Sequence, residues 1–505
     1  MSHETSSGSS PPGPDGGRPR PARATPTHCT PTYVDAASET DPQNRLAQTT
    51  RLVICCDGTA CSEYIGHEKT PITNVSRIAR SINQWGNDTT QIRQIVAYLP
   101  GIGTDERTIE QLNVVRQGTG KGLKSLVMQS YTFLSHNWTT DQDEIILIGF
   151  SRGAFAMRCL ADFIIKCGLL RKHDLDGLRG LYKIWREHTP YVLNERPFPK
   201  IKVCATWDTV ATLKNLVPRG KDILPFSMPN RKYSFVHSLL PEGIENAFQA
   251  LALHEHRYHF LPIVWVKHDN SQNLEQCWFT GYHRDIGGGS EDEVLSHFAL
   301  AWIIGKLQRF LSISVDQLWT HQDPKAWRTP KGEKLPVQDS RSMKWIFAEW
   351  MSLKVKFPGS AYRRPCYQFA DDRHLVIPAG MIGPEASKER IHFSTGFLQF
   401  HEVFERYGPF LHFNPEEDEF VRIGHTRHWS LKKPRKARRS RHDRAYEVQE
   451  DELDGYEKDV LQKWVKAQLR KLQIGAALGT ESRSILGTLN AYLDNPPRVD
   501  QIQEE

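Results

Sequence analysis

The sequence lacks any uninterrupted run of about 20 apolar residues, the length that a membrane-spanning helix requires. Its first 17 residues are rich in Ser, Pro and Gly and contain no apolar core, so no secretory signal is predicted. Only nine cysteines occur in 505 residues, without pattern and without a C-x-x-C pair. Such usage is typical of reduced thiols, and the sequence predicts a cytoplasmic protein that is neither secreted nor transmembrane.

The chain has little excess of charge of either sign, with 65 basic and 59 acidic residues. The whole excess lies in the segment 432–444, which holds eight basic residues and one acidic residue. This basic run favours peripheral association with an anionic membrane surface or nuclear import, and the alternative is a solvated loop balanced by acidic neighbours. Because no aromatic residue interleaves the run, base stacking is not indicated, and nucleic acid is not an expected partner.

Three regions follow one another along the chain. Residues 1–48 are rich in Ser, Thr, Pro and Gly and show no periodicity, so a disordered tail is predicted. In residues 49–312 short apolar strands alternate with helices, which predicts an α/β domain with a mostly parallel sheet and helices on both faces. Residues 313–505 form an appended, mixed helical C-terminal region.

Within residues 49–312 the predicted strands and helices follow from the spacing of hydrophobic residues. Strands are expected at 51–56, 92–98, 144–149, 202–206, 263–266 and 276–279, and helices at 73–82, 122–138, 154–167 and 295–311. In the C-terminal region helices are expected at 452–473 and 482–493.

The sharpest chemical signal is a G-x-S-x-G pattern formed by Gly149, Ser151 and Gly153. It directly follows an apolar strand and opens a helix, which is the context of a nucleophile elbow, a tight turn that projects the serine hydroxyl above the sheet. The glycines are needed because side chains would collide with backbone in so sharp a turn. An ordinary glycine turn is the alternative, since so short a pattern also arises by chance.

A serine nucleophile needs a base that is held by an acid. On an α/β-hydrolase the acid and then the histidine follow the serine, each on a loop after a later strand. Asp208 comes just after the strand at 202–206, and His283 just after the strand at 276–279. Asp208 could equally be a turn or capping residue, and His283 is one of 21 histidines. Asp285 is a rival acid that we expect to point elsewhere or to organise its loop.

The oxyanion hole should combine the backbone amide of Arg152 with a donor from an earlier loop. Gly58 and Thr59 are the candidates, with 101–104 as the alternative. Asp57 precedes this loop and is expected to support it.

Asp57 could instead be an aspartyl nucleophile or a metal ligand. It would then gather with Asp208, Asp285 and His283 around a hard divalent cation. The serine interpretation requires neither a metal nor a cofactor.

Six segments together resemble one family. They are Cys55–Thr59, Thr73–Val75, Pro100–Thr104, Gly149–Phe155, Trp207–Val210 and Trp278–Gly289. The sequence is similar to the DUF2235 family, also described as the catalytic domain of Tle1-like phospholipase effectors of type VI secretion, and its layout resembles eukaryotic, especially fungal, members. The resemblance covers about 51–310.

The resemblance implies an α/β-hydrolase core with Ser151 as nucleophile, Asp208 as acid and His283 as base, and it implies a lipid substrate. One departure is His254, where the family usually has Asp, while the following Glu255 is retained. This change bears on local support or substrate preference.

The sequence as a whole predicts a serine hydrolase that cleaves an ester bond, of a lipid or phospholipid, through an acyl-enzyme intermediate. The partner expected is therefore a small-molecule or lipid ester. Two alternatives stay open: a metal-dependent phosphoesterase-like enzyme, and a non-catalytic interaction protein that retains the hydrolase fold.

Overall fold

The chain is represented by a computed structural model. It describes residues 49–59, 61, 72–86, 92–102, 121–189, 197–210, 233, 235–236, 238–253, 255, 260, 262–267, 271–290, 293–319, 387–400, 420–422, 428–431, 447–474 and 480–495. The predicted disordered tail at 1–48 and the basic run at 432–444 lie outside these residues.

A single ten-stranded sheet organises the described residues, in the order β2-β1-β3-β4-β5-β6-β7-β10-β9-β8. The first eight strands in this order pair in parallel, and the last two add antiparallel pairs at one edge. In chain order the strands are β1 (Thr50–Cys56), β2 (Arg93–Leu99), β3 (Glu144–Phe150), β4 (Ile201–Trp207), β5 (Ile244–Ala252), β6 (Asn273–Phe279), β7 (Glu389–Ile391), β8 (Phe420–Arg422), β9 (His428–Leu431) and β10 (Glu447–Glu450). The predicted mostly parallel sheet is confirmed.

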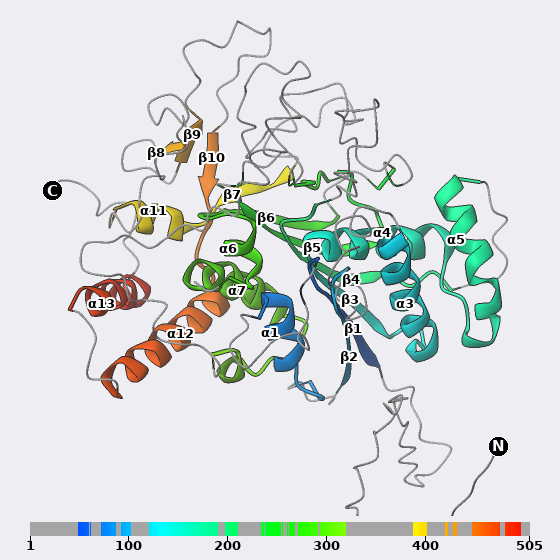
Figure 1. Ribbon diagram of the computed structural model, residues 1–505, viewed down its shortest axis with the longest axis horizontal. Helices are drawn as coiled ribbons and strands as arrows, with labels where there is room; N and C mark the ends of the chain where they lie inside the picture. Colours follow the sequence, from blue (N-terminus) through cyan, green and yellow to red (C-terminus); the bar gives the residue numbers. More distant parts are fainter. Residues whose placement is uncertain are drawn as a thin grey trace, which may run out of the picture. The chain divides into compact units, whose positions relative to one another are not determined.

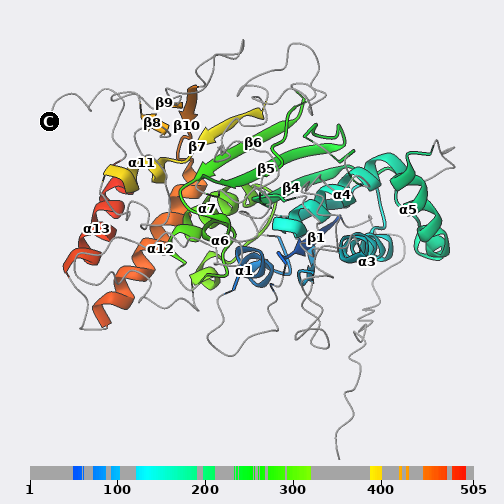
Figure 2. The ribbon, with the colours of Figure 1, turned by 45° about the horizontal axis from the view of Figure 1, so that its top comes forward.

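Helices cover both faces of the sheet, as predicted (Figures 1 and 2). On one face lie α3 (Lys121–Asn137), α4 (Ser151–Cys167) and α5 (Leu178–Glu187), and on the other α1 (Asn74–Ser81), α6 (His283–Gly287), α7 (Val294–Leu307) and α12 (Gly455–Ile474). Successive side chains of β1 enter the two cores alternately: Ile54 packs with α3 and α4, and Val53 and Cys55 pack with α1 and α7. Burial on both faces explains why the central strands are continuous apolar runs.

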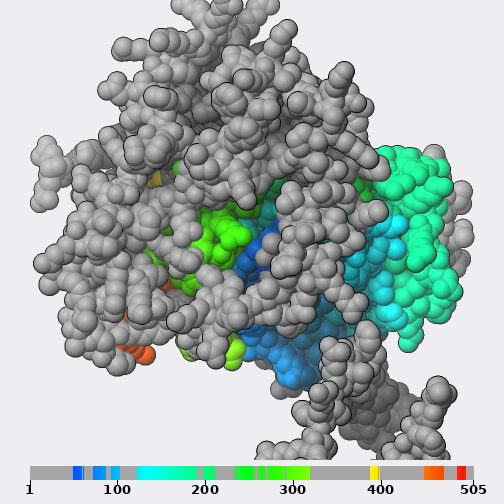
Figure 3. Space-filling view, in the orientation of Figure 1, coloured from blue at the N-terminus to red at the C-terminus, as the bar shows by residue number. Residues whose placement is uncertain are grey.

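Four further helical elements belong to the described part of the chain. They are η2 (Lys172–Gly177), η5 (Val315–Trp319), α11 (Phe393–Phe400) and α13 (Thr480–Asp494), which packs on α12. In Figure 3 segments coloured blue, green and cyan adjoin on one face, so residues far apart in the sequence share this surface. No helix among the described residues is long and apolar enough to cross a membrane.

One predicted strand is wrong. Residues 263–266 form no strand, and Val266 makes only an isolated bridge to Leu239. The place between β4 and β6 is taken by β5, Ile244–Ala252, whose polar residues obscured its strand character. Gln249 within β5 is fully buried, yet its side chain is hydrogen-bonded to Thr209 and Gln276. A buried polar group that is fully partnered is tolerated in a core strand, although it breaks the apolar pattern.

The described part of the C-terminal third joins the same sheet and core. β7 pairs with β6, β10 pairs with β7, and α12 packs against α7. The division of the chain into a domain at 49–312 and a region at 313–505 stays a prediction. In space, elements from both sides of that boundary form one core.

Candidate active site

The turn between β3 and α4 has the geometry of a nucleophile elbow. Ser151 adopts a positive φ of 57°, a conformation that is strained for a residue with a side chain. A Cβ at Gly149 would lie 2.7 Å from the Cα of Ala154, and one at Gly153 would clash with the carbonyl oxygens of Cys56 and Asp57. Helix α4 begins at Ser151 itself, three residues before the predicted start. Both glycines are therefore required by close backbone approach.

A hydrogen-bonded chain of three side chains begins at this turn. His283 Nε2 lies 2.7 Å from Ser151 Oγ, and His283 Nδ1 lies 2.6 Å from Asp208 Oδ2. All three residues are buried. Because an ionised carboxylate only accepts hydrogen bonds, the His283 Nδ1–H donates to Asp208, which leaves Nε2 to accept from the Ser151 hydroxyl. The structure brings together the three residues predicted from the sequence.

The positions of these side chains follow from the sheet. Ser151 and Asp208 come directly after the carboxyl ends of β3 and β4, and His283 comes four residues after the end of β6. This is the edge at which ligands bind in parallel α/β sheets. Asp208 is held on both sides: its backbone N–H donates to Ala250, and its Oδ1 accepts from the backbone N–H of Ala252. Strand β5 thus orients the acid although it contributes none of the three residues.

The His283 imidazole lies among aromatic rings. The Phe150 ring centroid is 4.7 Å away, and that of Phe260 is 4.9 Å away. The backbone N–H of His283 faces a buried carboxylate oxygen of Glu255 at 3.4 Å. Glu255 is a supporting residue that reasoning from hydrophobic pattern and strand ends does not identify; the only sequence signal was its place in the family-like segment at 250–257. His254, the departure in that segment, lies outside the described residues.

The loop after β1 lies beside Ser151. A Cβ at Gly58 would lie 3.4 Å from the Cβ of Ser151. The Gly58 amide, one candidate oxyanion donor, donates instead to Oδ1 of Asp57 at 2.7 Å. The neighbouring Thr59 differs, because its hydroxyl oxygen is buried and has no hydrogen-bond partner among the described residues. In the alternative segment at 101–104, residues 103 and 104 lie outside the described part of the chain.

Asp57 is a structural acceptor in this loop. Besides the Gly58 amide, its carboxylate accepts hydrogen bonds from the hydroxyls of Thr73 and Tyr98, both at 2.7 Å. These contacts join the end of β1 to the start of α1 and to β2. The buried Asp57 carboxylate therefore has three donors.

Asp285 also faces its own turn. Its Oδ2 accepts from the backbone N–H of Tyr282 at 2.8 Å, and the Tyr282 side chain accepts in return from the start of α6. These contacts hold Asp285 against the turn that leads into His283. Within the part of the chain that the structure describes, no group of three His, Cys, Asp or Glu residues is arranged to hold a metal ion.

Two ionisable groups beside the serine are shifted by burial. Desolvation lowers the pKa of the Arg152 guanidinium to about 10 and raises the pKa of the Cys61 thiol to about 12. Cys61 is therefore a neutral thiol near neutral pH and a poor nucleophile. Arg152 stays cationic, so the residue that follows Ser151 adds positive charge to the site.

Comparison with known proteins identifies the domain. The family described as "T6SS, Phospholipase effector Tle1-like, catalytic domain" matches residues 50–306, about half of the chain and all of the segment that holds the three side chains. The chain belongs to this family. Its α/β fold and the resemblance seen in the sequence are thereby confirmed.

Individual relatives of the Tle1-like chain are distant. An uncharacterised protein of Saccharomyces cerevisiae is 30% identical over 169 residues, which are 31% of this chain and 23% of that protein. The Tle1 effector bound to the VgrG spike of the type 6 secretion system is 21% identical with a TM-score of 0.31, over 51% of this chain and 56% of that one. An uncharacterised protein from Pseudomonas aeruginosa is 13% identical with a TM-score of 0.30, over 91% of this chain and 64% of that one. The chain thus spans less than two thirds of each of these proteins.

Proposed function

We propose that this Tle1-like chain is a serine hydrolase that cleaves an ester bond through an acyl-enzyme intermediate. The observation that carries the proposal is the continuous chain of hydrogen bonds from Ser151 through His283 to Asp208, with links of 2.7 and 2.6 Å. Distances of about 2.6–3.2 Å are those over which a base can take the proton of a nucleophile.

The three residues have separate tasks in this reaction. His283 takes the proton of Ser151 as the hydroxyl oxygen attacks the acyl carbon, and it then gives that proton to the departing alcohol. Asp208 keeps the imidazole in the required tautomer and stabilises its cation. Water, activated by the same imidazole, releases the acid and restores the serine.

The negative charge on the attacked carbonyl oxygen needs hydrogen-bond donors. We assign this role to the backbone amides of Arg152 and Thr59, and to the Thr59 hydroxyl. The Gly58 amide is engaged by Asp57, which favours Thr59 of the two loop candidates. A buried hydroxyl without a partner among the described residues is costly in the resting protein, and a substrate oxyanion would supply the missing acceptor.

The substrate we propose is a lipid ester, and membership of a phospholipase effector family supports this choice. The expected association of residues 432–444 with anionic membranes and the cytoplasmic location belong to the same proposal. The membrane association can be tested by measuring binding to vesicles with and without anionic lipid. The full chain is compared with a variant in which the basic residues of 432–444 are neutralised.

The experiment that tests the function is a panel of phospholipids and short soluble esters with wild type and Ser151→Ala, each with and without a chelator. The proposal predicts that Ser151→Ala loses all turnover above background and that the chelator has no effect. Turnover that survives Ser151→Ala but is lost with the chelator would favour the metal-dependent phosphoesterase. No turnover of any ester by wild type would favour the interaction protein.

A further inference from the structure

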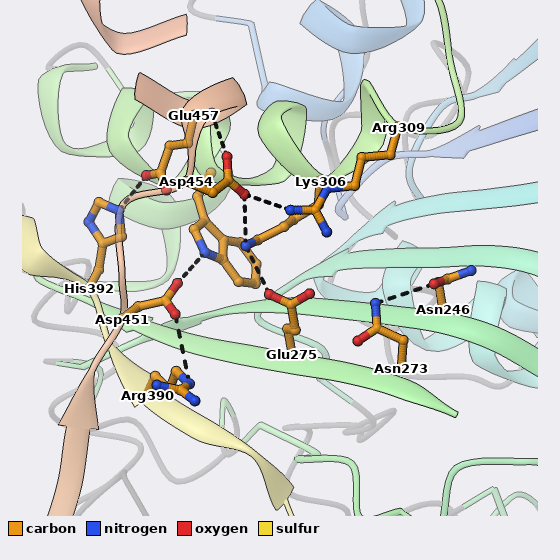
Figure 4. A network of polar contacts seen from close by, with 11 residues as sticks. Asn246, Asn273, Glu275, Lys306, Arg309, Arg390, His392, Asp451, Asp454 and Glu457 are labelled. Carbon is orange, nitrogen blue, oxygen red and sulfur yellow. Dashed lines mark hydrogen bonds and ion pairs between the residues drawn. The ribbon is translucent and has the colours of Figure 1, made fainter. Parts of the chain in front are cut away.

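A second cluster of ionisable side chains, buried or half-buried, joins the sheet to segments from the far end of the chain (Figure 4). Glu275 belongs to β6 and Lys306 to α7, whereas the other members follow β7 or lie around the start of α12. Those others are His392, Asp451, Asp454 and Glu457. The family match ends at residue 306, so this cluster connects the family domain to residues outside it.

Lys306 ties the start of α12 to β6. Its ammonium group, on a side chain only 4% exposed, lies 2.8 Å from a carboxylate oxygen of Glu275 and 3.2 Å from one of Asp454. The other oxygen of Asp454 accepts from the backbone N–H of Glu457 and so caps the first turn of α12. The position of Glu457 is therefore fixed from two elements of the family domain.

Glu457 contacts the segment that follows β7. Its Oε1 lies 2.6 Å from His392 Nε2, and His392 Nδ1 lies 2.8 Å from the Ser394 hydroxyl. Burial raises the pKa of Glu457 well above its usual value and lowers the pKa of His392 to about 3. The Ser394 backbone N–H donates to His392 Nδ1 at 3.3 Å, so Nδ1 is an acceptor and the His392 Nε2–H donates to Oε1 of Glu457.

His392 in turn lies against the end of β6. Its backbone N–H donates to the carbonyl oxygen of Trp278 at 2.9 Å, and its ring centroid is 4.3 Å from that of Phe279. Phe279 is the last residue of β6, and the chain then turns through Thr280 into α6, which begins at His283. The Glu457–His392 pair thus supports the strand end that precedes the turn into His283.

We propose that Glu457 is a positioning residue: through His392 it fixes the end of β6 and hence the place of the His283 imidazole. This inference rests on the proposed function of His283. It gives the region after residue 312 a part in the chemistry, although that region contributes none of the reacting groups.

Two substitutions at Glu457 separate the hydrogen bond from the packing. In Glu457→Gln the amide oxygen can accept from the His392 Nε2–H in place of the carboxyl oxygen, so kcat should stay near that of wild type. Glu457→Met has similar length and lacks this oxygen acceptor. We expect its kcat to be about 10- to 100-fold lower with little change in KM, because a small displacement of a reacting group is costly while substrate binding is untouched.

Leu461→Ala serves as the matched control. Leu461 is fully buried in the same core, one turn further along α12, so its truncation destabilises the helix packing without touching His392. At a temperature where all variants are folded, its kcat should equal that of wild type. A loss of kcat in Leu461→Ala as large as in Glu457→Met would reduce the role of Glu457 to general stability and overturn the proposal.

A spectroscopic readout makes the test independent of any ester. The short His283–Asp208 hydrogen bond should give a proton resonance far downfield in wild type, identified by its absence in Asp208→Ala. It should shift or broaden in Glu457→Met and not in Glu457→Gln or Leu461→Ala. An unchanged resonance and unchanged kcat in Glu457→Met would contradict the proposal. A wild type that has the resonance but hydrolyses no ester would contradict the proposed function alone.

Discussion

His283 Nε2 and Ser151 Oγ lie 2.7 Å apart although 132 positions separate the two residues in the sequence. Ser151 follows β3 and His283 follows β6, and two strands, β4 and β5, lie between β3 and β6 in the sheet. The contact therefore depends on the register of four parallel strands and on the turns at their carboxyl ends. Each of the following predictions concerns a substitution of a reacting group or of a residue that holds the site in place.

Asp208→Asn should lower kcat by roughly 10⁴-fold while leaving the fold intact. An amide can donate to Nδ1 and would then stabilise the wrong tautomer of His283, in which Nε2 carries a proton and cannot accept from Ser151. The side-chain oxygen can still accept from the Ala252 amide, as Oδ1 does in wild type. Steady-state kinetics with a soluble ester and a thermal unfolding curve check both statements. A loss of less than about tenfold would remove Asp208 from the proposed mechanism.

Thr59→Val tests the hydroxyl that we assign to the oxyanion hole. Valine retains the branched shape and the backbone amide but lacks the donor, so kcat should fall by roughly 10²-fold with KM little changed. Thr59→Ser retains the hydroxyl and should stay within a few fold of wild type. Equal activity of the valine and serine variants would leave the role to the backbone amides alone.

Gly153→Ala should disrupt the elbow. Its Cβ would collide with the carbonyl oxygens of Cys56 and Asp57, which belong to β1 and the loop after it, so the destabilisation should reach or exceed about 1–3 kcal/mol and turnover should be lost. Gly180→Ala in α5 is the control, because nothing lies within 4 Å of the added methyl group. It should stabilise the helix by about 0.5–1 kcal/mol without affecting turnover. Denaturant unfolding and ester hydrolysis of both variants provide the comparison.

The stability of the Glu457→Gln variant relative to wild type should increase as the pH rises. The folded chain holds the Glu457 proton more tightly than the unfolded chain, so its contribution is complete below the ordinary pKa of 4.5 and is lost as the pH rises toward the folded value. Glutamine has no proton to lose. The free energy of unfolding of the variant minus that of wild type should therefore increase by up to about 1.4 kcal/mol per pH unit.

Denaturant unfolding at several values between about pH 5 and 8 measures this slope. The lowered pKa of His392 acts in the opposite direction, since it favours the folded chain as the pH rises from about 3 to 6.5, but it is present in both proteins and cancels. A difference that does not change with pH would mean that Glu457 is ionised in the folded chain.

Local signals in the sequence predicted much of the fold and the three central side chains. Helix α1 begins where expected because the Thr73 side chain accepts from the Ser76 amide, a cap that residue type alone suggests. Ser151, Asp208 and His283 could be found because each follows an apolar strand, and parallel strands bring such positions to one edge. The resemblance of six short segments to a known family pointed to the same residues.

What could not be predicted depends on contacts between distant residues. Strand β5 was not predicted because Gln249 is polar and interrupts the apolar pattern. Its hydrogen-bond partners Thr209 and Gln276 come close only in the folded chain. The engagement of the Gly58 amide by Asp57 is a matter of one loop conformation, which composition does not determine. The Glu457–His392 pair joins residues 65 positions apart, and neither lies in a motif.

The proposed nucleophile can be tested by covalent labelling with a fluorophosphonate, which reacts with a serine activated by a neighbouring base. The account predicts one adduct per wild-type chain, located on Ser151 by mass spectrometry of the digested protein, and no adduct on folded Ser151→Ala. An adduct on another residue, equal labelling of both proteins, or no labelling of the folded wild type would contradict it.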